Sequence, residues 1–250
     1  MNQQFKEKYH NDGYLIINNA IDSNKINLFK SRYLDCSADT NNKANIFQNF
    51  YNYSEFPELM DLLCDEKIYS LFQTLDMEVA LHASSATVVS SDINWHQDCR
   101  VASKIAGDSY IGVWIALEDI SIESGPFQLI PGSHKWSVPF EELYPKEKFT
   151  HSDKPYEYFT NKINDNNYKI VSFVPKAGDI LFWHGHLVHR GSHPIDSSLT
   201  RMAAIGHYCN LRVDGPPESP ALDSKAHGLG EIFDTWNGAK YFKTSLGKEY

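Results

Sequence analysis

From residue 79 onward the chain is dominated by apolar and β-branched residues arranged in short runs. Six such runs lie at residues 79–90, 110–120, 127–134, 169–175, 179–189 and 200–209, and turn-forming Gly, Pro, Ser and Asp separate them. The runs follow one another without a helical pattern at every crossover, which favours an antiparallel sandwich or barrel over a parallel Rossmann-like sheet. We therefore expect a mainly β protein with flanking α-helices and a double-stranded β-helix core, that is, a jelly roll of the cupin type.

The first third of the chain has a different pattern. A short β-rich run at 13–21 follows an amphipathic opening that contains Phe5 and Tyr9. Asp22 or Ser23 can then cap a helix, and residues 56–76 repeat the helical spacing of apolar positions. These amphipathic helices are expected to pack against the sheet.

The length and patterning predict one domain over residues 1–250. It would consist of a helix-and-strand part at 1–78 and a jelly-roll core at 79–212. Two further segments do not fit a strand pattern: an insert at 138–168, and the tail at 213–250. Because long inserts in compact domains are often binding loops, the insert is expected to act as a lid.

Composition narrows the range of partners. The formal net charge of −9 disfavours binding to nucleic acid phosphates or to anionic lipid. The apolar run at 111–117 is too short to cross a bilayer, and the first residues lack the apolar core of a signal peptide. We expect a cytoplasmic protein that binds neither membrane nor nucleic acid. Its scattered cysteines would be reduced thiols; they are Cys36, Cys64, Cys99 and Cys209.

The sequence "NWHQD" places His96 and Asp98 two residues apart. On a strand, residues i and i+2 point to the same face, so this pair could hold adjacent positions on a metal ion. Two histidines and one carboxylate form the ligand set of non-heme Fe(II) enzymes. Candidates for the second histidine are His184, His186, His189 and His193. Strand alternation separates them into two pairs on opposite faces but does not choose between the pairs, and His96 and Asp98 alone could also be ordinary surface residues.

Arg201 lies on a predicted strand among apolar residues, with Ala203 and Ile205 on its face. A strand arginine usually points to solvent. Opposite a metal site, however, its planar guanidinium could hold a carboxylate through two parallel hydrogen bonds.

Three motifs in order carry a resemblance to a known family: "NWHQD", "YIGVWIALEDISIESGPFQLIPGSHKW" and "AGDILFWHGHLVHRGSHPIDSSLTR". Together they resemble the phytanoyl-CoA dioxygenase family of Fe(II)/2-oxoglutarate oxygenases, over residues 5 to 210. The resemblance implies that His96, Asp98 and His189 bind Fe(II), and that Arg201 anchors the co-substrate 2-oxoglutarate, with O2 as the oxidant.

The resemblance also implies roles around the co-substrate. Gln97 and Trp114 match positions that border it, and Ser192 matches a contact position. Arg190 intervenes before the Gly-Ser pair and departs from the family's commoner His-Gly-Ser order. His134 matches a turn position with a structural or rim role.

The activity implied is oxidation of an unactivated C–H bond in a small molecule, with succinate and CO2 as co-products. Since related halogenases lack the carboxylate, Asp98 favours hydroxylation, desaturation or cyclisation. Two alternatives stay open: a non-catalytic jelly-roll binding module, and a metalloenzyme that does not use 2-oxoglutarate.

The sequence identifies neither the substrate nor the oligomeric state. With no basic cluster to bind a CoA phosphate, we expect a small metabolite or natural product. His82, Arg100 and Lys104 could face it or be solvated. Aromatic residues available to the lid or tail are Tyr144, Phe149, Tyr156, Tyr158 and Trp236.

Overall fold

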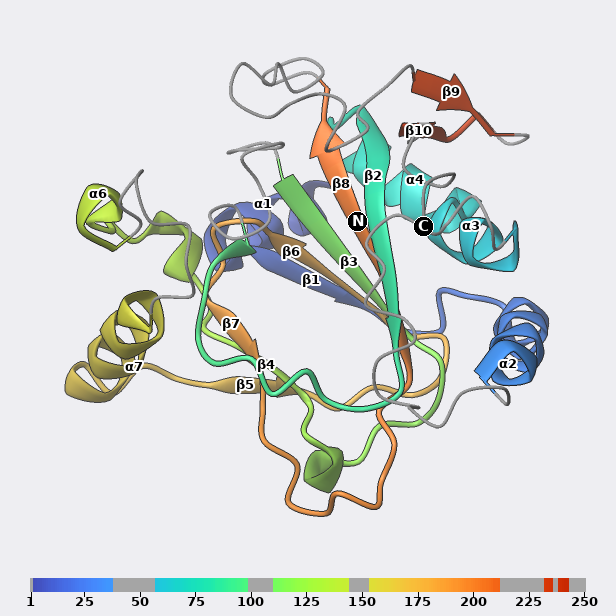
Figure 1. Ribbon diagram of the computed structural model, residues 1–250. Coiled ribbons are helices and arrows are strands. Elements are labelled where there is room, and N and C mark those ends of the chain that lie inside the picture. The colour runs from blue at the N-terminus through green and yellow to red at the C-terminus, as the bar shows by residue number, and fades with distance from the viewer. Residues whose placement is uncertain are drawn as a thin grey trace.

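The computed structural model describes residues 2–37, 57–98, 110–143, 153–211, 232–235 and 238–242. Their strands form two sheets, drawn in Figure 1. The larger has the order β1-β6-β3-β8-β2-β10-β9 and the smaller β5-β4-β7; every pair is antiparallel except β10–β2. The expected jelly-roll core is confirmed.

The bounds of the strands follow from the pairing. The larger sheet contains β1 (Tyr14–Ile17), β2 (Val79–Thr87), β3 (Tyr110–Ala116), β6 (Ile180–His184), β8 (Ala203–Asn210), β9 (Ile232–Asp234) and β10 (Lys240–Phe242). The smaller contains β4 (Phe127–Leu129), β5 (Val171–Phe173) and β7 (His189–Gly191).

Helices surround the sheets. They are α1 (Asn2–Asp12), α2 (Ser23–Ser37), α3 (Pro57–Leu63), α4 (Glu66–Thr74), α6 (Phe140–Leu143) and α7 (Lys154–Asp165), with short 3-10 turns η3 (Ile122–Ser124) and η4 (Ser133–Lys135). None of the helices in the described ranges is long and apolar enough to span a membrane.

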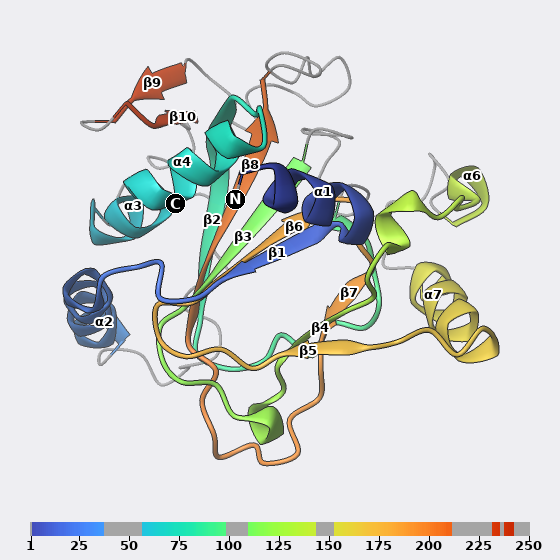
Figure 2. The ribbon, with the colours of Figure 1, turned by 180° about the vertical axis from the view of Figure 1, so that it is seen from behind.

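The two faces of the larger sheet have separate cores. Odd-numbered β3 residues such as Val113, together with Phe182 and Tyr208, pack against the helices α1 to α4, two of which lie across this face in Figure 2. Even-numbered residues such as Trp114, together with Trp183, face the smaller sheet. This alternation produces an enclosed inner surface between the sheets, and the helices close the outer one.

Several elements differ from the sequence prediction. The run at 179–189 is not one strand: β6 ends at His184, the chain turns, and β7 begins at His189 in the other sheet. The helical pattern at 56–76 is divided because the Asp65 side chain accepts a hydrogen bond from the Lys67 amide and caps α4.

The insert at 138–168 contains α6 and α7, and α7 packs against the outside of the small sheet through Phe159 and Ile163. In the tail, β9 and β10 extend the larger sheet beyond β2, which the sequence did not predict. The domain boundaries and the lid role of the insert stay predictions.

Candidate metal centre

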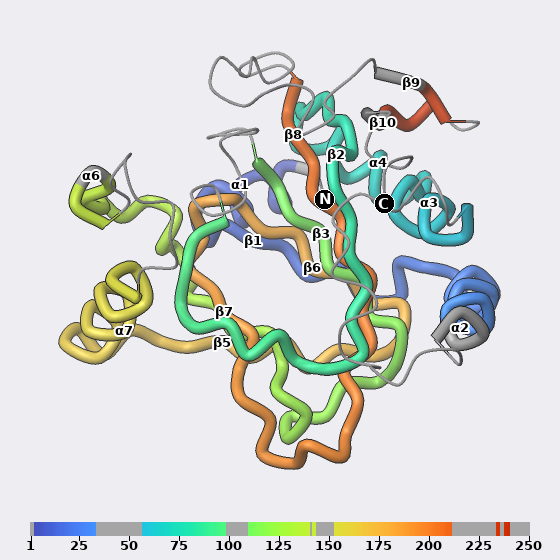
Figure 3. The backbone as a smooth tube through the Cα atoms, in the orientation of Figure 1, coloured from blue at the N-terminus to red at the C-terminus, as the bar shows by residue number. Residues whose placement is uncertain are grey.

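His96, Asp98 and His189 come together on the inner surface, each offering one ligand atom, and these atoms lie within 4.8 Å of one another. His96 Nε2 lies 3.4 Å from Asp98 Oδ1, and His189 Nε2 lies 3.5 Å from Asp98 Oδ2. The segment after β2 crosses to the smaller sheet, as Figure 3 shows, and His96 and His189 exchange two backbone hydrogen bonds of 3.0 Å there. Residues 93 positions apart in the sequence are therefore direct cross-strand neighbours.

Both imidazole rings are oriented by carbonyl oxygens of their own segments. His96 Nδ1 lies 2.7 Å from the Asn94 oxygen, and His189 Nδ1 lies 2.9 Å from the Leu187 oxygen. A carbonyl accepts only, so Nδ1 carries the proton in each neutral ring and the Nε2 lone pair points at the centre. Phe127 stacks on the His189 ring at 4.9 Å and restricts its rotation.

The electrostatics favour metal binding. Burial alone would raise the pKa of Asp98, but His189, His96 and His207 outweigh it and hold that pKa well below its usual value. Burial lowers the pKa of His189 to about 4, even though Asp98 opposes the shift. At neutral pH the site therefore presents an anionic carboxylate and a neutral His189, the forms that coordinate a divalent cation.

The structure separates the four candidate histidines. His184 lies near Tyr9 and His134 on the α1 side, His186 sits in the turn after β6, and His193 is exposed and paired with Asp92. Among the four, His189 alone reaches His96 and Asp98. His134 also lies away from the centre, with its Nε2 3.1 Å from the His10 carbonyl.

Arg201 is buried, with 2% of its surface exposed, and forms no ion pair with the residues that the structure describes. Its Nη2 makes one long contact of 3.4 Å to the Val89 carbonyl, and its Nε has no hydrogen-bond partner. Burial lowers the pKa of Arg201 to about 10, so the side chain is still charged at neutral pH. A buried cation without an anion is costly, so this position fits the carboxylate of a bound molecule.

Trp114 lies beside Arg201, one inner row before the Trp183 row that contacts Asp98. The Arg201 guanidinium carbon is 5.8 Å from the centre of the Trp114 ring, and the buried indole Nε1 has no partner among the described residues. Trp114 pairs with Ile205 on β8, while the next inner row toward the triad contains Gly112, Trp183 and His207. A dicarboxylate held by Arg201 would run along Trp114 toward the metal ligands.

Gln97 and Ser192 already have partners. The Gln97 amide nitrogen donates to the His186 carbonyl at 2.5 Å, and its Oε1 is buried without a partner. The Ser192 hydroxyl donates to the Pro126 carbonyl at 2.8 Å. Arg190 turns outward onto the Trp95 ring and donates to Gln128, so it leaves the inner surface free. Contacts of Gln97 and Ser192 with a co-substrate stay predictions.

Two parts of the inner surface were not found from the sequence, apart from His82, which was named there as a residue that could face the substrate. Trp183 donates its indole N–H to Asp98 Oδ2 at 2.9 Å. His82, Tyr110 and His207 form a buried cluster, with Tyr110 hydrogen-bonded to His207 and the His82 ring 5.9 Å from that of Tyr110. A β-bulge between Leu81 and Ala83 accompanies His82. His82 is 3% exposed and its Nδ1 has no partner, so it is not a solvated side chain.

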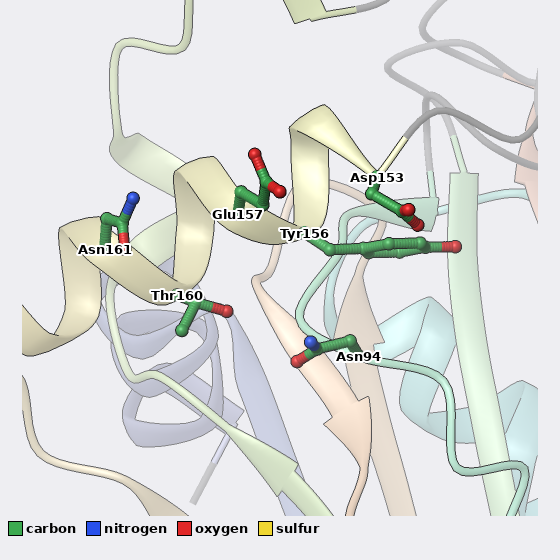
Figure 4. A pocket seen from close by; sticks show the side chains of 6 residues that line it. All are labelled: Asn94, Asp153, Tyr156, Glu157, Thr160 and Asn161. Atoms are coloured by element: carbon green, nitrogen blue, oxygen red, sulfur yellow. The ribbon is translucent and has the colours of Figure 1, made fainter.

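A cavity of about 500 Å³ lies between α7 and the segment that leads to His96. Figure 4 shows its lining: Asn94, Asp153, Tyr156, Glu157, Thr160 and Asn161. Tyr156, one of the aromatics expected in the lid, contributes to this cavity, whereas Tyr158 packs against Phe159 and Lys162. Arg100, Lys104, Tyr144, Phe149, Trp236 and Cys99 lie outside the described residues. Cys64 and Cys209 are buried.

Comparisons with known proteins agree with this geometry. The family model for phytanoyl-CoA dioxygenase (PhyH) matches residues 36–203. A relative described as a probable phytanoyl-CoA dioxygenase of Caenorhabditis elegans is 24% identical over 238 residues, covering 81% of this chain and 73% of the relative.

Solved structures share the fold at low identity. The epimerase SnoN in complex with Fe3+, alpha ketoglutarate and nogalamycin RO aligns with a TM-score of 0.66 and 16% identity, over 84% of this chain and 83% of that one. EctD from S. alaskensis with 2-oxoglutarate and 5-hydroxyectoine aligns with a TM-score of 0.64 and 17% identity, over 84% and 76%. With the family model matching two thirds of the sequence, the chain belongs to the phytanoyl-CoA dioxygenase (PhyH) family.

Proposed function

We propose that this protein is an Fe(II)/2-oxoglutarate-dependent oxygenase that oxidises a C–H bond of a small molecule. The observation that carries the proposal is one inner surface bearing both a His-Asp-His triad and a buried arginine with no anionic partner in the described ranges. A binding module needs neither feature, and a metalloenzyme that works without a keto acid has no need of Arg201.

The residues fit both groups. His96, Asp98 and His189 would hold Fe(II) and leave its other positions open. Arg201 would pair with the distal carboxylate of 2-oxoglutarate, and the unpaired Trp114 Nε1 lies beside that path. When bound, the iron and 2-oxoglutarate supply the oxidising chemistry with O2, and the keto acid leaves as succinate and CO2.

The protein's own part is positioning and the exclusion of water. The rings of Trp114, Trp183 and Phe127 line the inner surface and are at most 6% exposed. Their burial strengthens the attraction between Arg201 and a carboxylate, because the local dielectric constant is low.

The substrate is proposed to approach from the side opposite Arg201. On that side His207 lies in the Trp183 row, and Tyr110 and His82 continue the inner surface beyond it. Burial and His207 lower the pKa of His82 to about 3, so this ring is neutral and suits a hydroxyl or carbonyl group.

The α7 cavity supports a polar small molecule over an acyl-CoA. Its described lining offers hydroxyl, amide and carboxylate groups and contains neither lysine nor arginine. Hydroxylation as the outcome, a cytoplasmic location, and the absence of nucleic acid and membrane partners stay predictions.

The test is an anaerobic visible titration of the metal-free protein with Fe(II) and then 2-oxoglutarate. A charge-transfer band that requires both additions is expected. Arg201→Met should weaken 2-oxoglutarate binding by about 10- to 100-fold, since a buried hydrogen bond to a charged group contributes about 1.5–3 kcal/mol.

Arg32→Ala is the matched control, because Arg32 is exposed on α2. No band in the folded wild-type protein would refute the iron and keto-acid assignment. A band with normal 2-oxoglutarate affinity in Arg201→Met would refute the role of Arg201. Succinate release against a panel of small polar molecules would then identify the substrate.

A further inference from the structure

The two oxygens of Asp98 lie in different surroundings. Oδ1 is 3.4 Å from His96 Nε2 and accepts no hydrogen bond from the indole. Oδ2 is 3.5 Å from His189 Nε2 and also accepts the Trp183 N–H at 2.9 Å. The Trp183 side chain is 2% exposed and is enclosed by Phe127 and His189, with ring centres 5.3 and 5.6 Å away. The carboxylate is therefore held in one rotation by a rigid donor.

The indole reaches Asp98 only because position 112 has no side chain. Gly112 on β3 is the direct cross-strand neighbour of Trp183 on β6. A Cβ at position 112 would overlap the Cζ2, Cε2 and Cη2 atoms of the indole, well inside van der Waals contact. Since the backbone of Gly112 does not have the positive φ of a glycine turn, space for the ring explains the glycine.

The three ligand residues differ in how they are held. The two histidines are oriented by carbonyls two residues earlier in their own segments. Asp98 is oriented by a side chain 85 positions away, on a strand of the other sheet from β7. The local chain therefore fixes the imidazoles, and tertiary packing fixes the carboxylate.

We propose that Trp183, in the space left by Gly112, is a positioning residue that keeps Asp98 binding iron through one oxygen. With Oδ2 engaged by the indole N–H, Oδ1 is presented toward His96 and the metal. A carboxylate free to rotate could use both oxygens and occupy a position that 2-oxoglutarate or O2 requires. This inference rests on the proposed iron site and goes beyond it by assigning the pair that controls its carboxylate.

The direct test is Trp183→Phe, which removes the N–H donor and keeps an aromatic ring against Phe127 and His189. We expect the Fe(II) dissociation constant to rise about 10- to 100-fold, the usual effect of losing a partner of a metal ligand. The charge-transfer band formed with 2-oxoglutarate should also shift or lose intensity, because the carboxylate changes its coordination. Neither readout depends on turnover or on knowing the substrate.

Trp136→Phe is the matched control, since it makes the same change in a ring that packs on Tyr168 and under Lys162 instead of on Phe127 and His189. Its Fe(II) affinity and band should equal those of the wild type. Circular dichroism and thermal unfolding establish that each variant is folded before metal is added.

Gly112→Ala provides a second and independent variant, because it keeps the indole but forces it from its place. It should weaken Fe(II) binding and alter the band in the same way as Trp183→Phe. The double variant should bind Fe(II) no more weakly than the weaker of the two single variants. Wild-type affinity and band in a folded Trp183→Phe or Gly112→Ala protein would overturn the proposal. A wild-type protein that binds no Fe(II) would instead overturn the proposed function, and the inference with it.

Discussion

Asp98 supplies the only negative charge of the triad. This charge is what a divalent cation bound by two imidazoles would need. Asp98→Ala should abolish measurable Fe(II) binding and 2-oxoglutarate-dependent succinate release, because the remaining ligands carry no negative charge. Equilibrium Fe(II) titration and a succinate assay check this.

The control for that change is Asp92→Ala, which removes an exposed carboxylate that pairs with His193. It should leave both measurements unchanged. Full substrate oxidation by Asp98→Ala would show that the ligand assignment is wrong.

At the scale of single residues, the sequence predicted all three candidate metal ligands, although strand alternation alone could not choose the second histidine. The i, i+2 spacing of His96 and Asp98 is a local property and is present in the structure. The choice among four histidines is not local, since the chain bends between His184 and His189 and the alternation restarts. The family resemblance supplied His189 where the period could not.

At the scale of elements, Asp179 joins the turn before β6 to the turn after β1. Its carboxylate accepts hydrogen bonds from the Asn18 side chain, the Asn19 amide and the Lys176 amide at 2.8–3.0 Å. Asp179→Ala would leave these donors unsatisfied in a buried place and should lower the free energy of unfolding by about 2–4 kcal/mol. Urea denaturation measures the change.

The neighbouring Asp119→Ala is the control, because its ion pair with Lys176 is exposed. It should lower the free energy of unfolding far less than Asp179→Ala does, because its hydrogen bonds from Lys176 and Ala177 are made at the exposed surface. An equal loss in both variants would mean that the Asp179 hydrogen bonds do not join these elements.

The predicted elements agree with the structure where the apolar pattern extends over many residues. The two short strands of the tail were not predicted. The helix that begins at Ser23 and the strands β2, β3 and β8 follow their apolar patterns. The strands β9 and β10 have three residues each. β10 forms by pairing with β2 and β9 by pairing with β10, so no local pattern in the sequence predicts them.

At the scale of the whole molecule, buried neutral histidines should make stability depend on pH. The pKa of His82 is lowered to about 3 and that of His189 to about 4, against 6.5 for an ordinary histidine. Below pH 6.5 the unfolded chain binds more protons than the folded one. The free energy of unfolding of the metal-free protein should therefore fall as pH falls from 6.5 toward 4, by up to about 1.4 kcal/mol per pH unit for each histidine.

Urea unfolding at pH 7, 6 and 5 checks this expectation. His82→Gln removes one of these groups and should flatten the slope, whereas His193→Gln, in an exposed ion pair, should not. The same slope in His82→Gln as in the wild type would contradict the burial of a neutral His82.

The sequence by itself determined the fold class and the His96–Asp98 pair and, through the family motifs, predicted which residues bind iron and 2-oxoglutarate. These follow from local spacing or from short motifs, which a chain carries before it folds. Only the tertiary structure decided that Arg201 is buried with no anion from the described part of the chain, that His82 faces inward, and that Trp183 holds Asp98 across Gly112. Each of these depends on which atoms meet across two sheets, and contacts between segments far apart in the chain leave no period in the sequence.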